Sequence, residues 1–284
     1  MSDLKDIFLK WKDKKYLFDF ILMMIFLAIM VSSFYFCVVG GRPNLIPFII
    51  IVIICFTVIT LFLAKHLYIG VVLMVVAGLF GFITDFWGTG NNVFIYEQDT
   101  ITFLWLLKGI THGVPIEIVL SYFFSAMWMM QIIESLFDKE IEELIEEYDS
   151  GVKLIKSYKQ MLPAMIVIAI SVVIIIINPL LIQPWGFFSI GVVLTSLVPG
   201  NKKIIPIFFG IMVGVAGLFF ELFCSGEIIP EAVIWTYPNP DWGFEHSYRA
   251  IIAYGGFGAS LASIFLLLLK YPTFRKEISI IQLK

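Results

Sequence analysis

The stretch ELFCSGEIIPEAVIWTYPNPDWGFEHSYRAIIAY, residues 221–254, joins two long apolar segments through a short aromatic loop. It begins with a glutamate at the end of one apolar run and enters the next run at Arg249. Residues 85–117 have the same layout, because an aspartate ends an apolar run and aromatic residues follow it. Both stretches contain Gly-x-x-His, as Gly109–His112 and as Gly243–His246. We therefore interpret them as one structural unit that occurs twice, with its acids facing each other.

The composition is typical of a membrane protein. Hydrophobic residues make up 60% of the chain and charged residues only 14%, whereas a soluble domain carries roughly 25% charged residues. The apolar runs are continuous and do not alternate with polar residues, which favours transmembrane helices over an outer-membrane barrel. A net charge of −3 without a large basic cluster predicts no nucleic-acid partner. Three cysteines and three scattered histidines predict free thiols and no metal site.

The lengths of the apolar runs predict about eight transmembrane helices. Five lysines precede the first run, which is too long for a signal peptide and should remain as an anchor. The fifth run ends in Asn178–Pro179 and the sixth is short, so these two spans are the least regular. The runs lie near residues 17–39, 45–64, 67–86, 114–137, 162–182, 185–199, 203–224 and 249–269.

The distribution of basic residues predicts the orientation of these spans. With eight spans, all but three of the 19 basic residues fall on one side of the membrane, and the exceptions are Arg42, Lys108 and Arg249. Because cytoplasmic loops are enriched in Lys and Arg, we expect a multi-pass protein of the cell membrane with both termini in the cytoplasm. Both aromatic loops then lie on the outer side.

The two halves of the chain correspond. Asp85 and Glu221 are 136 residues apart, and His112 and His246 are 134 residues apart. These spacings predict an all-α transmembrane helical bundle of two parallel four-helix repeats, residues 1–137 and residues 161–284. Chance similarity between apolar segments is the alternative interpretation.

Residues 138–160 form the only long polar segment between the halves. Ile141, Leu144, Ile145 and Tyr148 recur at helical spacing opposite a row of glutamates, which predicts an amphipathic cytoplasmic linker helix. Anionic headgroups would repel its acidic face, so we expect it to pack against the bundle.

Small residues at four-residue spacing predict which helices approach closely. Such spacing occurs in the third, seventh and eighth spans, so we expect the third, fourth, seventh and eighth spans to form the centre of the bundle. The pairs are Ala77 and Gly81, Gly210 and Gly214, Gly255 and Ala259, and Gly258 and Ala262.

Three acids lie in apolar context near the outer ends of spans: Asp85, Glu117 and Glu221. A carboxylate is costly in hydrocarbon, so such residues usually face a cavity or a partner. Desolvation favours the neutral acid, which can protonate an alkene, and nearby aromatic faces can stabilise the resulting carbocation. That chemistry needs no cofactor. We expect these three acids to be catalytic, and the substrate to lie against Trp87, Tyr96, His112, Trp235, Tyr237, His246 and Tyr254.

Structural roles are the alternative for several of these residues. Glu117 follows Pro115, and an acid in the first turn of a helix is favoured by the helix dipole. Outer Trp and Tyr residues are common interface anchors, and the two loop histidines could cap loops or pair with acids. Asp85 and Glu221 recur at matched positions, which favours a functional role for them.

Short motifs in the same regions match a known pattern. An acid, two glycines and a tyrosine are followed by Gly-Val-Pro and an aromatic helix, and Pro-Ile-Glu and Trp-Thr-Tyr also occur. The residues are Asp85, Gly88, Gly90, Tyr96, Gly113–Pro115, Tyr122–Phe124 and Trp128, then Pro115–Glu117 and Trp235–Tyr237.

In these motifs, over about residues 85–130 and 219–260, the chain resembles the carotenoid-biosynthesis membrane family that includes bisanhydrobacterioruberin hydratase. It is more distantly similar to the small membrane lycopene cyclases. The second half departs from the pattern, with Ser247–Arg249 in place of Gly-x-Pro, and one acid is Asp where Glu is commoner. The resemblance implies proton-initiated hydration or cyclisation of a polyisoprenoid end group.

Two main hypotheses follow. The first is a membrane enzyme that modifies a lipid-soluble polyisoprenoid, with membrane lipids as its other partners. The second is a transporter or binding protein for a small or lipidic solute, which would need polar residues in the inner half of the bundle. A scaffold that grips a partner through its aromatic loops is a third. The sequence does not determine the oligomeric state.

Overall fold

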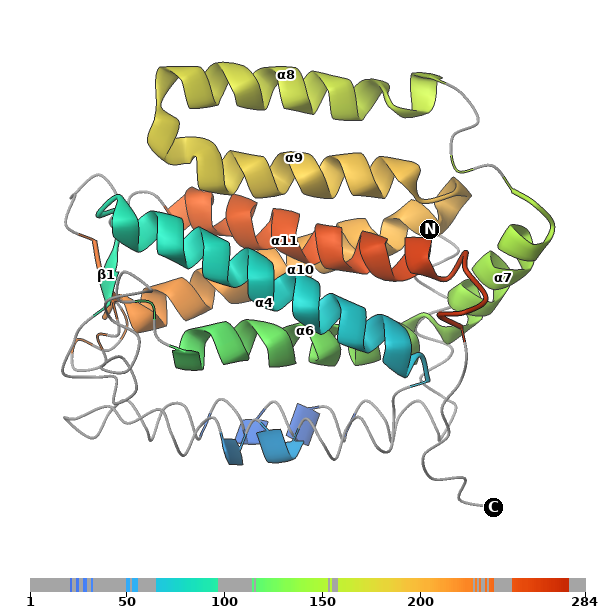
Figure 1. Cartoon of the computed structure of the whole chain (residues 1–284), viewed down its shortest axis with the longest axis horizontal. Coiled ribbons are helices and arrows are strands. Elements are labelled where there is room, and N and C mark those ends of the chain that lie inside the picture. The colour runs from blue at the N-terminus through green and yellow to red at the C-terminus, as the bar shows by residue number, and fades with distance from the viewer. Residues whose placement is uncertain are drawn as a thin grey trace.

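A computed structural model of the chain describes residues 65–96, 116–152, 158–226, 235–237 and 247–275, with isolated positions elsewhere. The predicted spans at 17–39 and 45–64 lie outside the described residues except at a few scattered positions. The described chain is a bundle of nearly parallel helices (Figure 1).

The long helices run back and forth between two ends of this bundle, with the strand β1 (Ile95–Tyr96) at one end and the helix α7 (Asp138–Asp149) at the other (Figure 1). In the described part of the chain, three short 3-10 turns connect helices: η2 (Tyr158–Gln160), η3 (Pro179–Leu181) and η4 (Gly200–Lys203). The helices are α4 (Leu67–Gly90), α6 (Ile116–Leu136), α7 (Asp138–Asp149), α8 (Leu162–Ile177), α9 (Ile182–Leu197), α10 (Ile204–Cys224) and α11 (Ser247–Leu268).

Four helical segments in the described part are long and apolar enough to cross a membrane: Leu67–Gly90, Ile118–Leu136, Gly200–Cys224 and Tyr248–Leu268. This finding supports the prediction of a helical membrane protein. The helices α8 and α9 are also apolar but shorter, with 16 residues each.

The boundary between the fifth and sixth apolar runs differs from the prediction. The fifth run was expected to continue to residue 182, but α8 ends at Ile177 and α9 already begins at Ile182. Pro179 explains the break, because proline has no N–H for the helix ladder and restricts the residue before it. Asn178 accordingly has an extended backbone.

Helix α11 is the centre of the described bundle, because α4, α6, α9 and α10 all pack against it. The predicted small-residue contacts are present between α10 and α11, where a Cβ on Gly210 would lie 3.1 Å from the carbonyl oxygen of Gly255. A second such contact was not predicted. A Cβ on Gly256 would lie 2.4 Å from the backbone of Phe187, so α9 also approaches α11 closely. Backbone proximity of this kind requires glycine.

One feature departs from an all-α fold. Strands β1 (Ile95–Tyr96) and β2 (Trp235–Thr236) pair antiparallel, with Ile95 opposite Thr236 and Tyr96 opposite Trp235. The pair is only two residues long, so its backbone bonds contribute little stability. It nevertheless joins the two loops that the sequence identified as corresponding.

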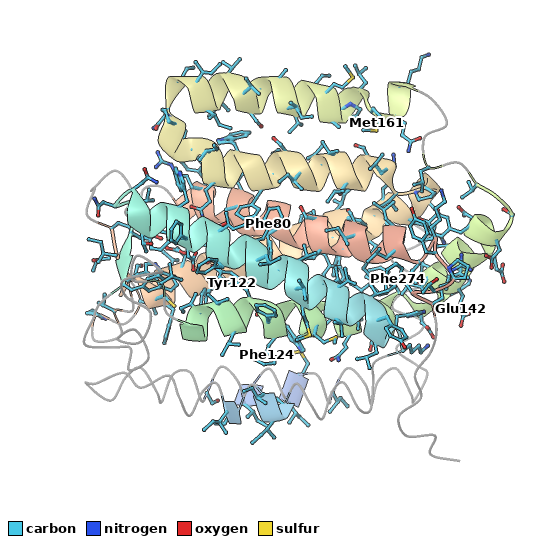
Figure 2. The ribbon with its side chains drawn as sticks, in the orientation of Figure 1. Phe80, Tyr122, Phe124, Glu142, Met161 and Phe274 are labelled. Atoms are coloured by element: carbon cyan, nitrogen blue, oxygen red, sulfur yellow. The ribbon has the colours of Figure 1, made fainter. Side chains whose placement is uncertain are left out.

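The amphipathic helix packs as predicted. Ile141, Leu144 and Tyr148 on α7 are buried in the same hydrophobic cluster as α4, α6, α10 and α11, and the Tyr148 hydroxyl donates to the carbonyl of Leu266 at 3.2 Å. Glu142 is exposed on the outer side of α7 (Figure 2). The helix covers only the first part of the predicted linker, because it ends at Asp149.

Candidate functional site

A cavity of about 140 Å³ lies at the β1 end of the bundle. Helices α4, α6, α9, α10 and α11 all contribute to its lining, together with residues of and beside the two strands. Asp85 and Glu221 both line this one cavity. The two acids that the sequence identified as equivalent therefore share a single space.

Asp85 is held by two tyrosines. It lies in the last two turns of α4 and is 3% exposed. The Tyr96 hydroxyl donates to its Oδ2 at 2.8 Å, and the Tyr122 hydroxyl lies 3.3 Å from its Oδ1. Figure 2 shows Tyr122 in the half of the bundle that is nearer β1.

Glu221 is held in a matching way by Trp235 and Tyr254. The indole Nε1 of Trp235 donates to its Oε1 at 2.9 Å, and the Tyr254 hydroxyl lies 3.5 Å from its Oε2. In both cases, a residue of the strand makes the short hydrogen bond and a tyrosine of the following helix makes the longer contact. Oxygen-to-oxygen hydrogen bonds are ordinarily 2.5–3.0 Å, so the second oxygen of each carboxyl group is the more loosely held.

The pairing of the strands positions the two donors. Because Tyr96 lies opposite Trp235 in the β1–β2 ladder, their side chains project to the same side. Their rings meet at 5.9 Å with planes 85° apart. Tyr96 hydrogen-bonds Asp85 and Trp235 hydrogen-bonds Glu221. The strand pair therefore positions the donors of both acids.

Tyr96 is an uncharged hydrogen-bond donor to Asp85. Burial and the neighbouring Asp85 raise the pKa of Tyr96 well above its ordinary value, so the phenol stays protonated and donates a hydrogen bond to the carboxyl group. Among the described residues, the ion pairs include neither Asp85 nor Glu221. Arg249 is the one basic residue of the described lining, and its guanidinium lies over the ring of Tyr248 at 5.8 Å.

Aromatic rings form most of the remaining lining. On the strand side, Phe94 meets Tyr96 at 5.6 Å and 87° and meets Tyr237 at 6.3 Å and 75°. On the helix side, Tyr122 and Phe187 both contact the ring of Phe257 edge to face. Such rings present electron-rich faces as well as apolar surface.

The structure brings six of the residues expected from sequence around this cavity: Asp85, Tyr96, Glu221, Trp235, Tyr237 and Tyr254. Trp87, which was also expected to contact the substrate, is half-buried and is not part of this lining. Two residues along a helix are about 200° apart around its axis, so Trp87 cannot share the face of Asp85. The side chain of Glu117 and both His112 and His246 lie outside the described residues.

Sequence reasoning did not assign Tyr122, Phe257 or Gln183 to the site, although all three line the cavity. The sequence offered a signal for Tyr122. It occupies a position on α6, the helix that follows the Asp85 segment, similar to that of Tyr254 on α11, the helix that follows the Glu221 segment. No local signal marked Gln183, which comes from α9 through tertiary packing. Among the described residues, no group of three possible metal ligands occurs.

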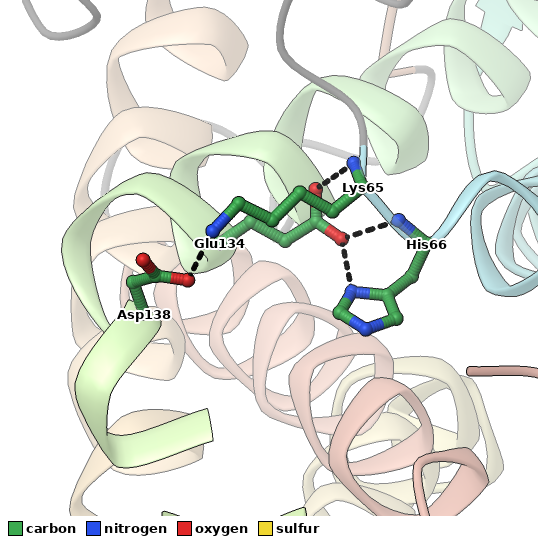
Figure 3. A network of polar contacts seen from close by, with 4 residues as sticks. All are labelled: Lys65, His66, Glu134 and Asp138. Carbon is green, nitrogen blue, oxygen red and sulfur yellow. Dashed lines mark hydrogen bonds and ion pairs between the residues drawn. The ribbon is translucent and has the colours of Figure 1, made fainter. Parts of the chain in front are cut away.

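A second polar cluster lies at the other end of α4 (Figure 3). The carboxylate of Glu134 accepts hydrogen bonds from the backbone N–H of Lys65 at 3.1 Å and of His66 at 3.0 Å, and it contacts His66 Nδ1 at 2.7 Å. Lys65 also pairs with Asp138. An acid from α6 thus satisfies backbone donors at the start of α4, where helices favour negative charge.

Comparison with models of protein families, with curated proteins and with solved structures gave no match.

Proposed function

We propose that this protein is a membrane enzyme that protonates the end group of a lipid-soluble polyene and so initiates its hydration or cyclisation. The supporting observation is the shared cavity, in which two buried carboxyl groups are each held by two aromatic hydrogen-bond donors. A buried acid beside aromatic rings is suited to forming and sheltering a carbocation.

The hydrogen bonds favour Asp85 as the proton donor. Both of its partners are phenols, which can donate or accept, so either carboxyl oxygen can carry the proton. The Oδ1 oxygen, loosely held by Tyr122, would deliver that proton to a terminal alkene carbon. The alkene electron pair forms the new C–H bond, and the neighbouring carbon becomes cationic.

Glu221 is suited to the second step. An indole N–H can only donate, so Trp235 keeps Oε1 of Glu221 as an acceptor. In hydration, a water oxygen adds to the cation and Glu221 takes the proton that the water loses. In cyclisation, an internal alkene adds instead, and Glu221 removes a C–H proton to leave the new ring alkene. Glu117, expected from sequence to be the second carboxylate, remains a candidate for orienting the water.

The size of the cavity supports an end-group reaction. At about 140 Å³ it is close to an engineered cavity of about 150 Å³ that binds benzene. One isoprene unit or one ring fits such a space, so the rest of a long polyene would lie outside it, in lipid. No cofactor is part of this proposal.

We further propose two parallel four-helix repeats, residues 1–137 and 161–284, with both termini in the cytoplasm. The matched acids, the matched donors and the antiparallel β1–β2 pair support the duplication. The excess of basic residues on the α7 side supports the orientation.

Transport of a solute is the competing hypothesis, and the packing of the bundle weighs against it. Towards α7, the described core is filled by large apolar side chains, including the fully buried Met127, Met130, Phe209 and Phe265. A transporter needs a polar route on that side as well.

Expression in cells that accumulate an acyclic polyene such as lycopene tests the proposal. We expect a hydrated or cyclised product with the wild-type protein, and a loss of at least about 100-fold with Asp85→Asn or Glu221→Gln, the range for removal of a general acid or base. Glu142→Gln makes the same chemical change at an exposed acid and should retain activity. Unchanged conversion in both cavity variants would refute the assignment.

A further inference from the structure

We propose that the acidic aromatic cavity binds a small organic cation of the tertiary or quaternary ammonium class. The cation would occupy the place of the carbocation in the proposed reaction. The inference rests on the proposed function for the nature of that intermediate, but binding can be measured without any substrate.

Charge is the first argument. Asp85 and Glu221 line the cavity, and Arg249 is the only basic residue of the described lining. When both acids are ionised, the lining carries a net charge of −1, so one monovalent cation neutralises it. The Arg249 guanidinium lies over the exposed ring of Tyr248 in the first turn of α11.

The arrangement of rings is the second argument. Tyr237, Phe94, Tyr96 and Trp235 contact one another in series, and their planes stand 75°, 87° and 85° apart. Rings that meet nearly at right angles form adjoining walls, whereas parallel rings form a flat stack. Adjoining aromatic walls are the arrangement that surrounds quaternary ammonium groups, which are attracted to the ring faces.

The cavity volume limits the size of the ligand. A cavity close to the benzene-binding size of about 150 Å³ admits one six-membered ring and excludes a bulky molecule. An ammonium group needs no hydrogen-bond partner when it is fully alkylated, so it can lose its water in an apolar cage at a smaller cost than a lysine-like ammonium.

The probe is 1,1-dimethylpiperidinium, a permanently charged six-membered ring. Its neutral control is 4,4-dimethyltetrahydropyran, which has nearly the same shape and is also soluble in water. Isothermal titration calorimetry on the purified full-length protein in detergent measures both affinities. We expect the cation to bind at least tenfold more tightly than the ether.

Variants separate the contributions of charge and rings. Asp85→Asn and Glu221→Gln should each weaken cation binding by about tenfold and leave the affinity for the ether unchanged. Phe94→Leu removes a wall ring that has no hydrogen-bond role, and should weaken cation binding by about threefold. Glu142→Gln is the matched control at an exposed acid and should bind like the wild type. Circular dichroism and gel filtration establish that each variant is folded.

Equal affinity for the cation and the ether, or wild-type cation binding in both acid variants, overturns the inference. The two proposals fail separately. If the cation binds as expected but no polyene is converted, the reaction is wrong and the cation site stands. If polyenes are converted while the cation does not bind, the cage is wrong and the proposed reaction stands.

Discussion

At the scale of single residues, the two acids of the cavity differ in their partners although they occupy matched positions. Asp85 accepts its short hydrogen bond from the phenol of Tyr96, whereas Glu221 accepts its own from the indole of Trp235. A phenol oxygen can either donate or accept a hydrogen bond, whereas an indole N–H can only donate one. Duplication would thus supply the symmetric frame, and this one difference would divide the two acids between donor and acceptor roles.

Glu134 shows a buried acid with a structural role. It is 3% exposed and accepts two backbone N–H groups at the start of α4 while contacting the His66 ring. Glu134 lies on α6, so its hydrogen bonds connect α6 to the beginning of α4.

We predict that Glu134→Ala lowers the stability of the protein by about 2–4 kcal/mol, because it leaves buried donors without an acceptor. Glu134→Gln retains one acceptor oxygen and should cost less. The thermal unfolding midpoint in detergent, followed by circular dichroism, measures both effects. An alanine variant as stable as the wild type would contradict the assigned role, and Glu142→Ala serves as the exposed control.

At the scale of elements, α11 owes its central position to small residues on several faces. Gly255 allows contact with α10, and Gly256 allows contact with α9. Without these glycines, side chains would hold the neighbouring helices farther away, and the cavity walls that α9 and α11 share would separate.

We predict that Gly256→Ala destabilises the protein by about 1–3 kcal/mol, the usual cost of overpacking. Its Cβ would meet backbone atoms of Phe187 and Phe188, which cannot rotate away. Gly186→Ala on α9 is the matched control, because nothing lies within 4 Å of the Cβ that it would add. Thermal midpoints of the two variants should differ clearly. A neutral Gly256→Ala would mean that α9 does not approach α11 as closely as described.

At the scale of the whole molecule, the two ends of the bundle have different chemistry. One end carries the acids, the aromatic rings and the strand pair, whereas the other carries α7 and its ion pairs with Lys202 and Arg275. This asymmetry, together with the basic residues of the α7 side, is what the proposed orientation rests on.

We predict that the two ends are accessible from opposite sides of the membrane. A cysteine placed at Glu142 should react with a membrane-impermeant maleimide only when the cytoplasmic side is exposed. A cysteine at Ile95, which is 42% exposed on β1, should react in intact cells. The variants are made in a chain whose three native cysteines are replaced by serine. Labelling of both positions from the same side would refute the proposed orientation.

Much of the fold was predictable from local patterns. Long apolar runs predicted the helices α4, α6, α10 and α11. In lipid, an apolar segment must form its backbone hydrogen bonds internally, and a single segment can do so only as a helix. The amphipathic pattern of α7 and the small-residue contact between α10 and α11 were also predicted correctly. The division between α8 and α9 was misplaced by a few residues, since apolar character continues across Pro179 and hides the break.

The site was predictable only in part. The matched positions of Asp85 and Glu221 marked both acids, and the loop aromatics pointed to Tyr96 and Trp235. Trp87 was expected beside Asp85 but does not line the cavity, because proximity in sequence does not specify the face of a helix. Gln183 and Phe187 were missed, since α9 reaches the cavity only by packing against α11.

The sequence by itself determined that the chain is built of apolar helices, that two segments each begin with an acid at the end of an apolar run, and that one helix is amphipathic. Each of these features depends on residues close together along the chain. Only the tertiary structure decided that both acids open into one cavity, that Tyr96 stands opposite Trp235, and that α11 is central. Those relations depend on contacts between segments more than 100 residues apart, and hydrophobicity is not directional, so composition cannot specify which helix packs against which.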